Sequence, residues 1–121
     1  MPLTTSGCNL MLNALIGTNP TTPITHASLH TADPGDTGTN ETSGGSPAYA
    51  RQSISFSAAA AKNIDSSNQP VFDVNSGVTV SHVGFFSASV GGTFLASADV
   101  TDETFGAQGT YTLTDADISL T

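Results

Sequence analysis

The sequence predicts a mainly β protein, an antiparallel β-sandwich or barrel of about six or seven strands with one short N-terminal helix. Apolar and polar residues alternate along several short segments, most regularly at 48–57 and 93–100. Turn signals rich in Gly, Pro, Asn and Ser separate these segments. Helical spacing of apolar residues is convincing in one segment only, near the N-terminus. A chain of 121 residues has the usual size of one domain, so we expect 1–121 to form a single β domain.

The helical pattern covers residues 8–16, within an N-terminal segment, 1–23, that closes with two prolines. Thr5 or Ser6 is expected to cap its start, and Gly17 suits the left-handed position after its end. Its apolar face carries Leu12, Leu15 and Ile16. Because a nine-residue helix is marginal alone in water, this face is expected to pack on its own domain or on a neighbouring subunit.

The first strand is expected at 24–31, and a long loop, 33–47, follows it. This loop contains four glycines and two prolines, so we expect it to be either functional or flexible. The second strand is expected at 48–57. Its alternation directs Ile54 and Phe56 into the core and places Arg51 outward, on the same side as Tyr49. Residues 58–61 are too few to assign.

Short strands are further expected at 71–74, 78–87, 93–100, 110–114 and 117–121. In 78–87 the apolar positions change parity, which predicts a bulge near Ser81–His82 or burial on both faces. Gly91–Gly92 indicates a hairpin turn, and 102–109 a polar turn. In the last segment Ile118 and Leu120 are expected to point inward.

Charge excludes more functions than any motif supports. The chain has two basic residues, Arg51 and Lys62, against ten acidic ones, for a net charge of −8. Two cations cannot neutralise a phosphate backbone or an anionic lipid surface, so neither nucleic acid nor membrane is an expected partner. With 37% hydrophobic residues and no Trp, the core must consist largely of small side chains. We therefore expect a homo-oligomer, or docking on a larger body.

No residue is predicted to catalyse a reaction or to bind a cofactor or a metal. Cys8 is the single cysteine and is expected to be a small buried residue. His26 and His30 share one side of a strand but lack a third zinc ligand. Asp33, Asp36 and Glu41 are suitable calcium ligands, yet their spacing lacks the EF-hand pattern and favours a solvated loop. Nucleophile-elbow and nucleotide-binding motifs are absent from the sequence, so an enzyme is not expected.

Three segments in order carry a resemblance: LHTADPGDTG at 29–38, YARQSISF at 49–56 and VSHVGFF at 80–86. Together with the short N-terminal helix they resemble a family of small virion proteins of tailed bacteriophages, often labelled tail-fibre-like. The resemblance spans most of the chain and implies a structural virion protein without catalytic residues. The family pattern has a larger apolar residue where His30 stands, which implies a less buried strand here.

The resemblance leaves the place of the protein on the particle open. Small size, acidity and the lack of a fibrous repeat favour a capsid decoration (cement) protein that binds the major capsid protein and stabilises the head. The alternative is a tail, tail-fibre or tail-tip component that binds tail proteins. A carbohydrate-binding β-sandwich is a more distant alternative. Aromatic platforms are desirable in a sugar site, and Tyr49 and Tyr111 are the only polar-tipped aromatic residues of this chain. In either virion interpretation the protein is located in the virion and is assembled in the host cytoplasm.

Two regions are the candidate interfaces. The N-terminal helix offers Leu12, Leu15 and Ile16 as apolar anchors, and the loop 33–47 offers Asp33 and Asp36 with its backbone groups. Arg51, if outward, is the one expected charged anchor.

Overall fold

The computed structural model describes residues 3–17 and 22–119 of the chain. In these residues it has one helix and eight strands, and every strand pair is antiparallel. The elements are α1 (Thr5–Leu15), β1 (His26–His30), β2 (Gln52–Ser53), β3 (Asn63–Asp65), β4 (Val71–Val74), β5 (Thr79–Phe86), β6 (Phe94–Thr104), β7 (Gly109–Thr112) and β8 (Asp117–Ser119). The mainly β fold with one short helix is confirmed, and the sheets of the described residues stay open rather than closing into a barrel.

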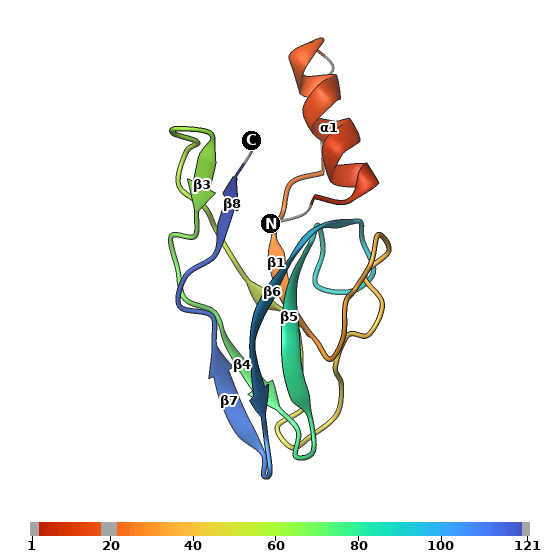
Figure 1. Cartoon of the computed structure of the whole chain (residues 1–121), viewed down its shortest axis with the longest axis vertical. Helices are drawn as coiled ribbons and strands as arrows, with labels where there is room; N and C mark the ends of the chain where they lie inside the picture. The colour runs from red at the N-terminus through yellow and green to blue at the C-terminus, as the bar shows by residue number, and fades with distance from the viewer. Residues whose placement is uncertain (1–2, 18–21, 120–121) are drawn as a thin grey trace.

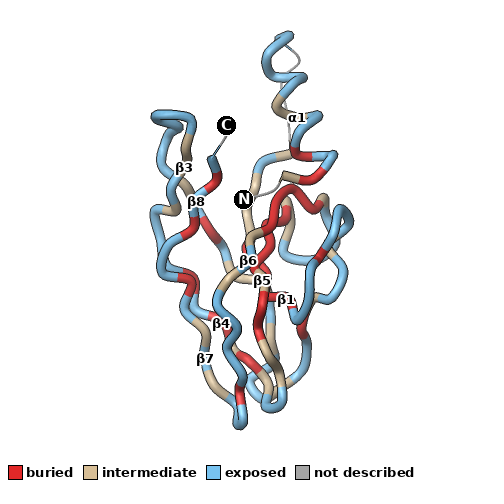
Figure 2. The backbone as a smooth tube through the Cα atoms, in the orientation of Figure 1, coloured by how far each residue is buried: buried red, intermediate tan, exposed pale blue. Residues whose placement is uncertain are grey.

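A four-stranded sheet with the order β2-β1-β5-β6 forms the body, and two ribbons, β3–β8 and β4–β7, lie beside it (Figure 1). The main core draws side chains from both parts. Leu29, Val83 and Phe85 come from the sheet, and Phe72 and Ile118 come from the ribbons. Figure 2 shows these buried segments facing one another along the length of the molecule. The ribbons therefore cover one face of the sheet, as the second layer of a sandwich does.

The loop 33–47 covers the opposite face of the sheet. Beneath it lies His30, whose Nδ1 donates to the carbonyl oxygen of Thr39 at 2.8 Å, together with the rings of Phe86 and Phe94. The inference of a less buried strand at His30 is wrong, because this side chain is 0% exposed. A histidine is tolerated there because both ring nitrogens have hydrogen-bond partners.

Burial on both faces and a bulge together explain the apolar pattern of β5. The register of β5 against β6 shifts between Val80 and His82, where the bulge was predicted. The extra residue lets Val80 and Val83, which lie on opposite parities of a regular strand, both enter the main core. Gly84 lies where β5 passes under His30. A Cβ atom there would lie 2.6 Å from a ring atom of Phe94 and 2.7 Å from His30 Nε2.

Several element boundaries differ from the prediction. Within the expected strand at 48–57 only Gln52–Ser53 forms a strand, and Ala48 and Phe56 form isolated bridges to Gly45 and Ser66. Ser55 N bonds to the side chain of Asn68, which interrupts the ladder. Ile54 is buried all the same. β6 continues to Thr104, so 102–104 form strand rather than turn, and β3 occupies a segment that had no assignment. Ile118 points inward as expected, and Leu120 lies outside the described residues.

The helix starts three residues earlier than predicted. Thr4, not Thr5 or Ser6, is the N-cap, and its hydroxyl accepts a hydrogen bond from Gly7 N at 3.1 Å. Gly17 has a φ of +85°, as predicted for the residue beyond the helix end. Small residues in the first turn, which weakened the helical pattern, are what allow α1 to approach the sheet.

Candidate protein interface

The first turn of α1 is fixed on the edge of the sheet. Thr4 N donates to Leu95 O at 3.0 Å, and the Thr4 hydroxyl donates to Phe94 O at 2.6 Å. Gly7 is the buried residue of the helix, and a Cβ atom there would overlap the carbonyl of Leu95. The rest of α1 extends away from the body (Figure 1).

The apolar face of α1 is exposed to solvent. Leu12 is 60% exposed, Leu15 82% and Ile16 78%, so the face predicted to pack does not pack on its own domain. Cys8 is exposed rather than buried, because it lies on this same side of the helix. We call the following residues the α1 surface: Cys8, Met11, Leu12, Leu15 and Ile16. A shallow hollow of about 490 Å³ runs along it, next to Leu3.

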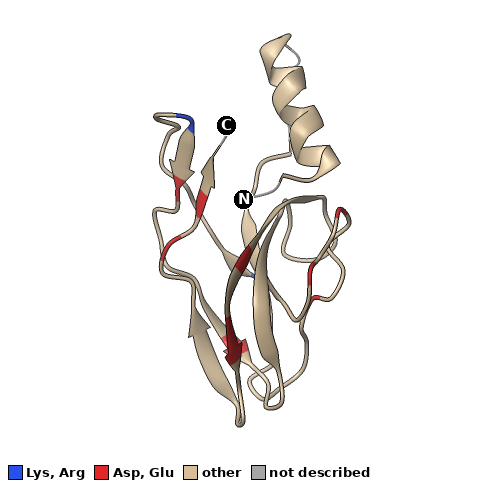
Figure 3. Cartoon of the chain, in the orientation of Figure 1, with Lys and Arg blue, Asp and Glu red and all other residues tan. Residues whose placement is uncertain are grey.

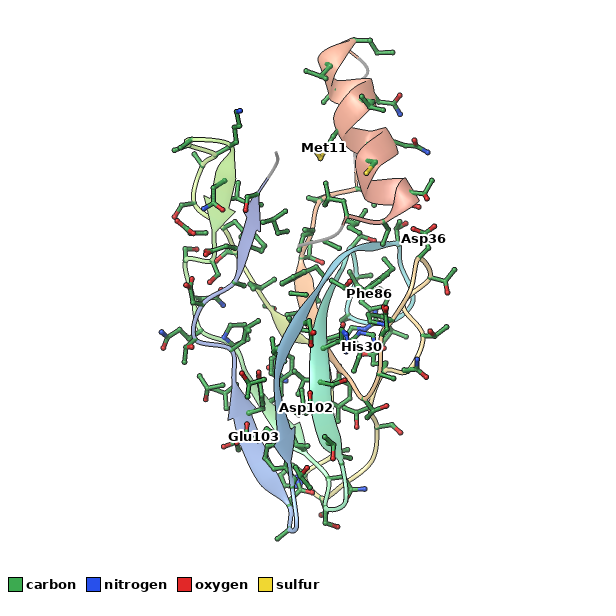
Figure 4. The ribbon with its side chains drawn as sticks, in the orientation of Figure 1. Met11, His30, Asp36, Phe86, Asp102 and Glu103 are labelled. Carbon is green, nitrogen blue, oxygen red and sulfur yellow. The ribbon has the colours of Figure 1, made fainter. Side chains whose placement is uncertain are left out.

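A cleft separates α1 from the β3–β8 ribbon and continues the α1 surface. Met11 lines both hollows of the cleft, which have volumes of about 190 and 270 Å³, and Ile64 of β3 and Ile118 of β8 line both as well. Figure 4 shows Met11 pointing from α1 toward this side. The sequence did not bring Met11, Ile64 and Ile118 together, because no local pattern predicts the pairing of β3 with β8.

The α1 surface has no charge. None of the residues of α1 is acidic or basic, although the chain has ten acidic residues (Figure 3). Lys62 lines the far side of the cleft. At the helix N-terminus Asp36 accepts a hydrogen bond from Thr5 N at 2.7 Å, where the helix dipole favours a carboxylate. Two predicted interface regions, α1 and the loop 33–47, therefore meet at Asp36.

The other predicted loop residue shapes the loop. Asp33 Oδ1 accepts a hydrogen bond from Gly35 N at 2.9 Å, which closes a tight local turn. Asp33, Asp36 and Glu41 do not come together as a cation site. Among the described residues the group of carboxylates close enough to share an ion is Asp65, Asp115 and Asp117, all of them exposed.

Arg51 lies apart from α1, and its predicted outward direction is wrong. Its guanidinium donates to both carboxylate oxygens of Glu41 at 2.9 Å and lies 3.5 Å from the centre of the Phe86 ring. It also donates to the carbonyls of Ala88 and Gly91, at 3.0 and 2.8 Å. β2 begins only at Gln52, so strand alternation does not apply to Arg51. The guanidinium is thus bound within the chain, which argues against the role of a charged anchor.

Glu41, Tyr49 and His30 complete a buried polar network around Arg51. Burial alone would raise the pKa of Glu41, but hydrogen bonds from Arg51 and Tyr49 outweigh it and hold the pKa below its usual value. Burial, and then the hydrogen bond to Glu41, raise the pKa of Tyr49. Burial lowers the pKa of His30 and outweighs the opposing hydrogen bond to Thr39. The groups with these shifted pKa values, Glu41, Tyr49 and His30, hold the loop 33–47 on the sheet.

Across the described residues, every buried side-chain nitrogen and oxygen has a hydrogen-bond partner. Tyr49 is stacked on Phe72 with its hydroxyl bonded to Glu41 at 2.7 Å, so it is not an open aromatic platform for a sugar. Among the described residues the exposed large apolar side chains are Leu12, Leu15, Ile16, Val71 and Val90, and three of these five lie together on the α1 surface. The described helix is too short and too polar to cross a membrane.

These features define a small β-sheet structural protein that presents an uncharged apolar helix at one end. The chain belongs to the family described as Podophage GP4 fiber I protein gp80, which it matches over residues 2–121. It is therefore a tailed-phage virion protein of the fibre type, as the resemblance of its three segments implied. No curated protein matches the chain.

Proposed function

We propose that this protein is a non-catalytic structural component of a podophage fibre, and that the α1 surface is where it attaches within that assembly. The observation that carries the proposal is the exposed α1 surface, in a chain whose family is described as a fibre protein. The rest of the domain supplies a rigid base for this helix, through Thr4, Gly7 and the sheet.

The family description favours a fibre over the capsid decoration protein that composition alone favoured. A decoration protein caps contacts of a shell, whereas the family is described by a fibre protein, which supports the fibre interpretation. Tail or fibre proteins are accordingly the proposed partners, and assembly into the virion in the host cytoplasm is the proposed route. A role in sugar binding has little support, because Tyr49 is buried in the network.

The proposal that the protein has no enzymatic activity has similar support. Two residues that could act as a base or an acid, Glu41 and His30, are held by structural hydrogen bonds to Arg51 and Thr39. Hydrolytic turnover by the pure protein on phage-host surface polymers would contradict it.

The experiment that tests the fibre assignment locates the protein on the particle. Virions would be labelled with gold-conjugated antibody against this protein and viewed by electron microscopy, and its copy number would be measured against the major capsid protein in separated heads and tails. Label on fibres and a low copy number are expected. Uniform label over the head, with a copy number close to that of the capsid protein, would instead establish decoration.

A further inference from the structure

We infer that the α1 surface is the contact through which copies of this chain associate, with the helix of one copy packed along the helix of another. Cys8, Met11 and Leu15 follow one another at spacings of three and four residues, with Leu12 beside them. This spacing places side chains in the seam of packed helices. Among the described residues α1 is the one helix, and in a two-fold dimer the same surface of both copies meets, so α1 packs on α1.

Charge identifies the occupant as a second copy. Two chains of net charge −8 repel one another wherever their acidic faces meet. The acidic residues lie in the loop 33–47, on β4, on β6 and around β3–β8, whereas α1 has none. A basic partner would be matched by an acidic surface, which α1 does not offer. The uncharged helix is the place where two copies can approach without that repulsion.

The docking of α1 leaves the seam available to another copy. Thr4 and Gly7 fix only the first turn, and the exposed side chains follow on the part of the helix that extends from the body. An 11-residue helix is about 16 Å long, at about 1.5 Å per residue. A helix pair of this length falls short of the roughly 800 Å² per partner of a typical stable interface. Association through this helix pair is therefore expected to be weak and to depend on concentration.

The inference stands apart from the place of the protein in the virion, since it concerns the purified chain. Sedimentation velocity of the full chain would be measured up to on the order of 100 μM, a range that detects even weak dimers. Leu15→Glu would be compared with Val90→Glu, because both residues are exposed, at 82% and 86%, and Val90 lines a different hollow, with Glu41 and Arg51. Circular dichroism would establish that both variants are folded.

The expected result is association of the wild type and of Val90→Glu, with at least a tenfold loss for Leu15→Glu. A thiol-specific bismaleimide should join Cys8 of two wild-type copies, and Leu15→Glu should suppress this product. A wild type that stays monomeric throughout overturns the inference, even if α1 proves to bind a different virion protein. Equal loss in both variants, or none in Leu15→Glu, also overturns it.

Discussion

The Arg51 guanidinium joins segments that are far apart in the chain. It binds Glu41 from the loop 33–47 and the carbonyls of Ala88 and Gly91 from the connection between β5 and β6, and it lies on the ring of Phe86. The side chains of Arg51 and Glu41 are only 11% and 22% exposed. Removing one member of a buried pair is costly because the other charge remains without its partner.

We expect Arg51→Gln to lower the free energy of unfolding by roughly 2–4 kcal/mol, since Glu41 keeps only its hydrogen bond to Tyr49. Lys62→Gln is the matched control, because it removes the other basic charge of the chain at an exposed position. Its effect should stay within about 0.5 kcal/mol. Urea unfolding of both variants at one protein concentration measures these free energies. Equal losses for Arg51→Gln and Lys62→Gln would show that net charge, rather than the buried pair, determines the stability.

Gly84 is the residue that lets His30 and Phe94 lie against β5. We expect Gly84→Ala to cost about 1–3 kcal/mol of stability, because its Cβ atom would lie within 2.8 Å of Ser28, His30 and Phe94. Gly106→Ala provides the control, since a Cβ atom there has no neighbour within 4 Å. It should be neutral, or stabilising by up to about 1 kcal/mol. Thermal unfolding of both variants tests this, and a neutral Gly84→Ala would contradict the packing described.

At the scale of elements, the β3–β8 ribbon holds an electrostatic conflict. Asp65 and Asp117 lie directly opposite one another across the two strands, and Asp115 is near both. The hydrogen bond to Asp65, with the charge of Asp115 nearby, raises the pKa of Asp117 to about 6. The same pairing holds the pKa of Asp65 below its usual value, so the pair shares one proton in mildly acidic solution.

The ribbon should therefore lose stability as the pH rises through this range. Between pH 3.8 and about 6 the folded chain binds more protons at Asp117 than the unfolded chain does, so the free energy of unfolding falls as pH increases. Asp117→Asn cannot ionise and still donates to Asp65. We expect its melting temperature to exceed that of the wild type at pH 7.5 and to converge with it at pH 4.

Asp102→Asn is the control for this pH effect. Asp102 is exposed on β6, in the part of the strand away from α1 (Figure 4). The difference in melting temperature between Asp102→Asn and the wild type should be the same at pH 7.5 and at pH 4. A pH-independent effect of Asp117→Asn would argue against the shared proton.

Most elements could be predicted from the sequence because their signals are local. The parity change in β5 located its bulge, and Gly17 located the end of α1. The pairing of β3 with β8 joins segments near 64 and 118, and no local pattern encodes it. The alternation at 48–57 overstated a strand, because loop and side-chain hydrogen bonds replace the ladder on both sides of Gln52–Ser53.

The candidate interface was predictable to a similar extent. The helical period grouped Leu12, Leu15 and Ile16, and the low content of large apolar residues indicated that a partner is needed. Strand parity misplaced Arg51, because parity holds only while the strand continues. Met11, Ile64 and Ile118 meet in the cleft through tertiary packing, so no spacing rule brings them together.

At the scale of the whole molecule, charge is unevenly distributed. One end carries the uncharged α1, and the outer part of β6 at the other carries Asp102 and Glu103 (Figures 3 and 4). Electrostatic repulsion between copies thus acts over the body, while the apolar contact proposed for α1 is free of it. Association through α1 should therefore become stronger with added salt, whereas association through ion pairs would become weaker.

We expect the association constant of the wild-type chain to rise several-fold between about 50 mM and about 500 mM NaCl, because salt screens the repulsion between bodies. Sedimentation equilibrium measures this. Leu15→Glu should remain monomeric at both concentrations. Weaker association at high salt would point to ion pairs at the contact and against an apolar one.

The way α1 begins also bears on how far assembly can proceed. Leu3 forms a bridge with Ala96, and Thr4 occupies the carbonyl of Leu95, so the chain covers part of the free edge of β6 itself. Farther along, Asp99, Asp102 and Glu103 line that edge with negative charge. Strands from neighbouring molecules therefore cannot readily extend the sheet. Assembly should stop once each α1 is packed against another α1. This favours closed complexes of fixed size over open-ended β polymers.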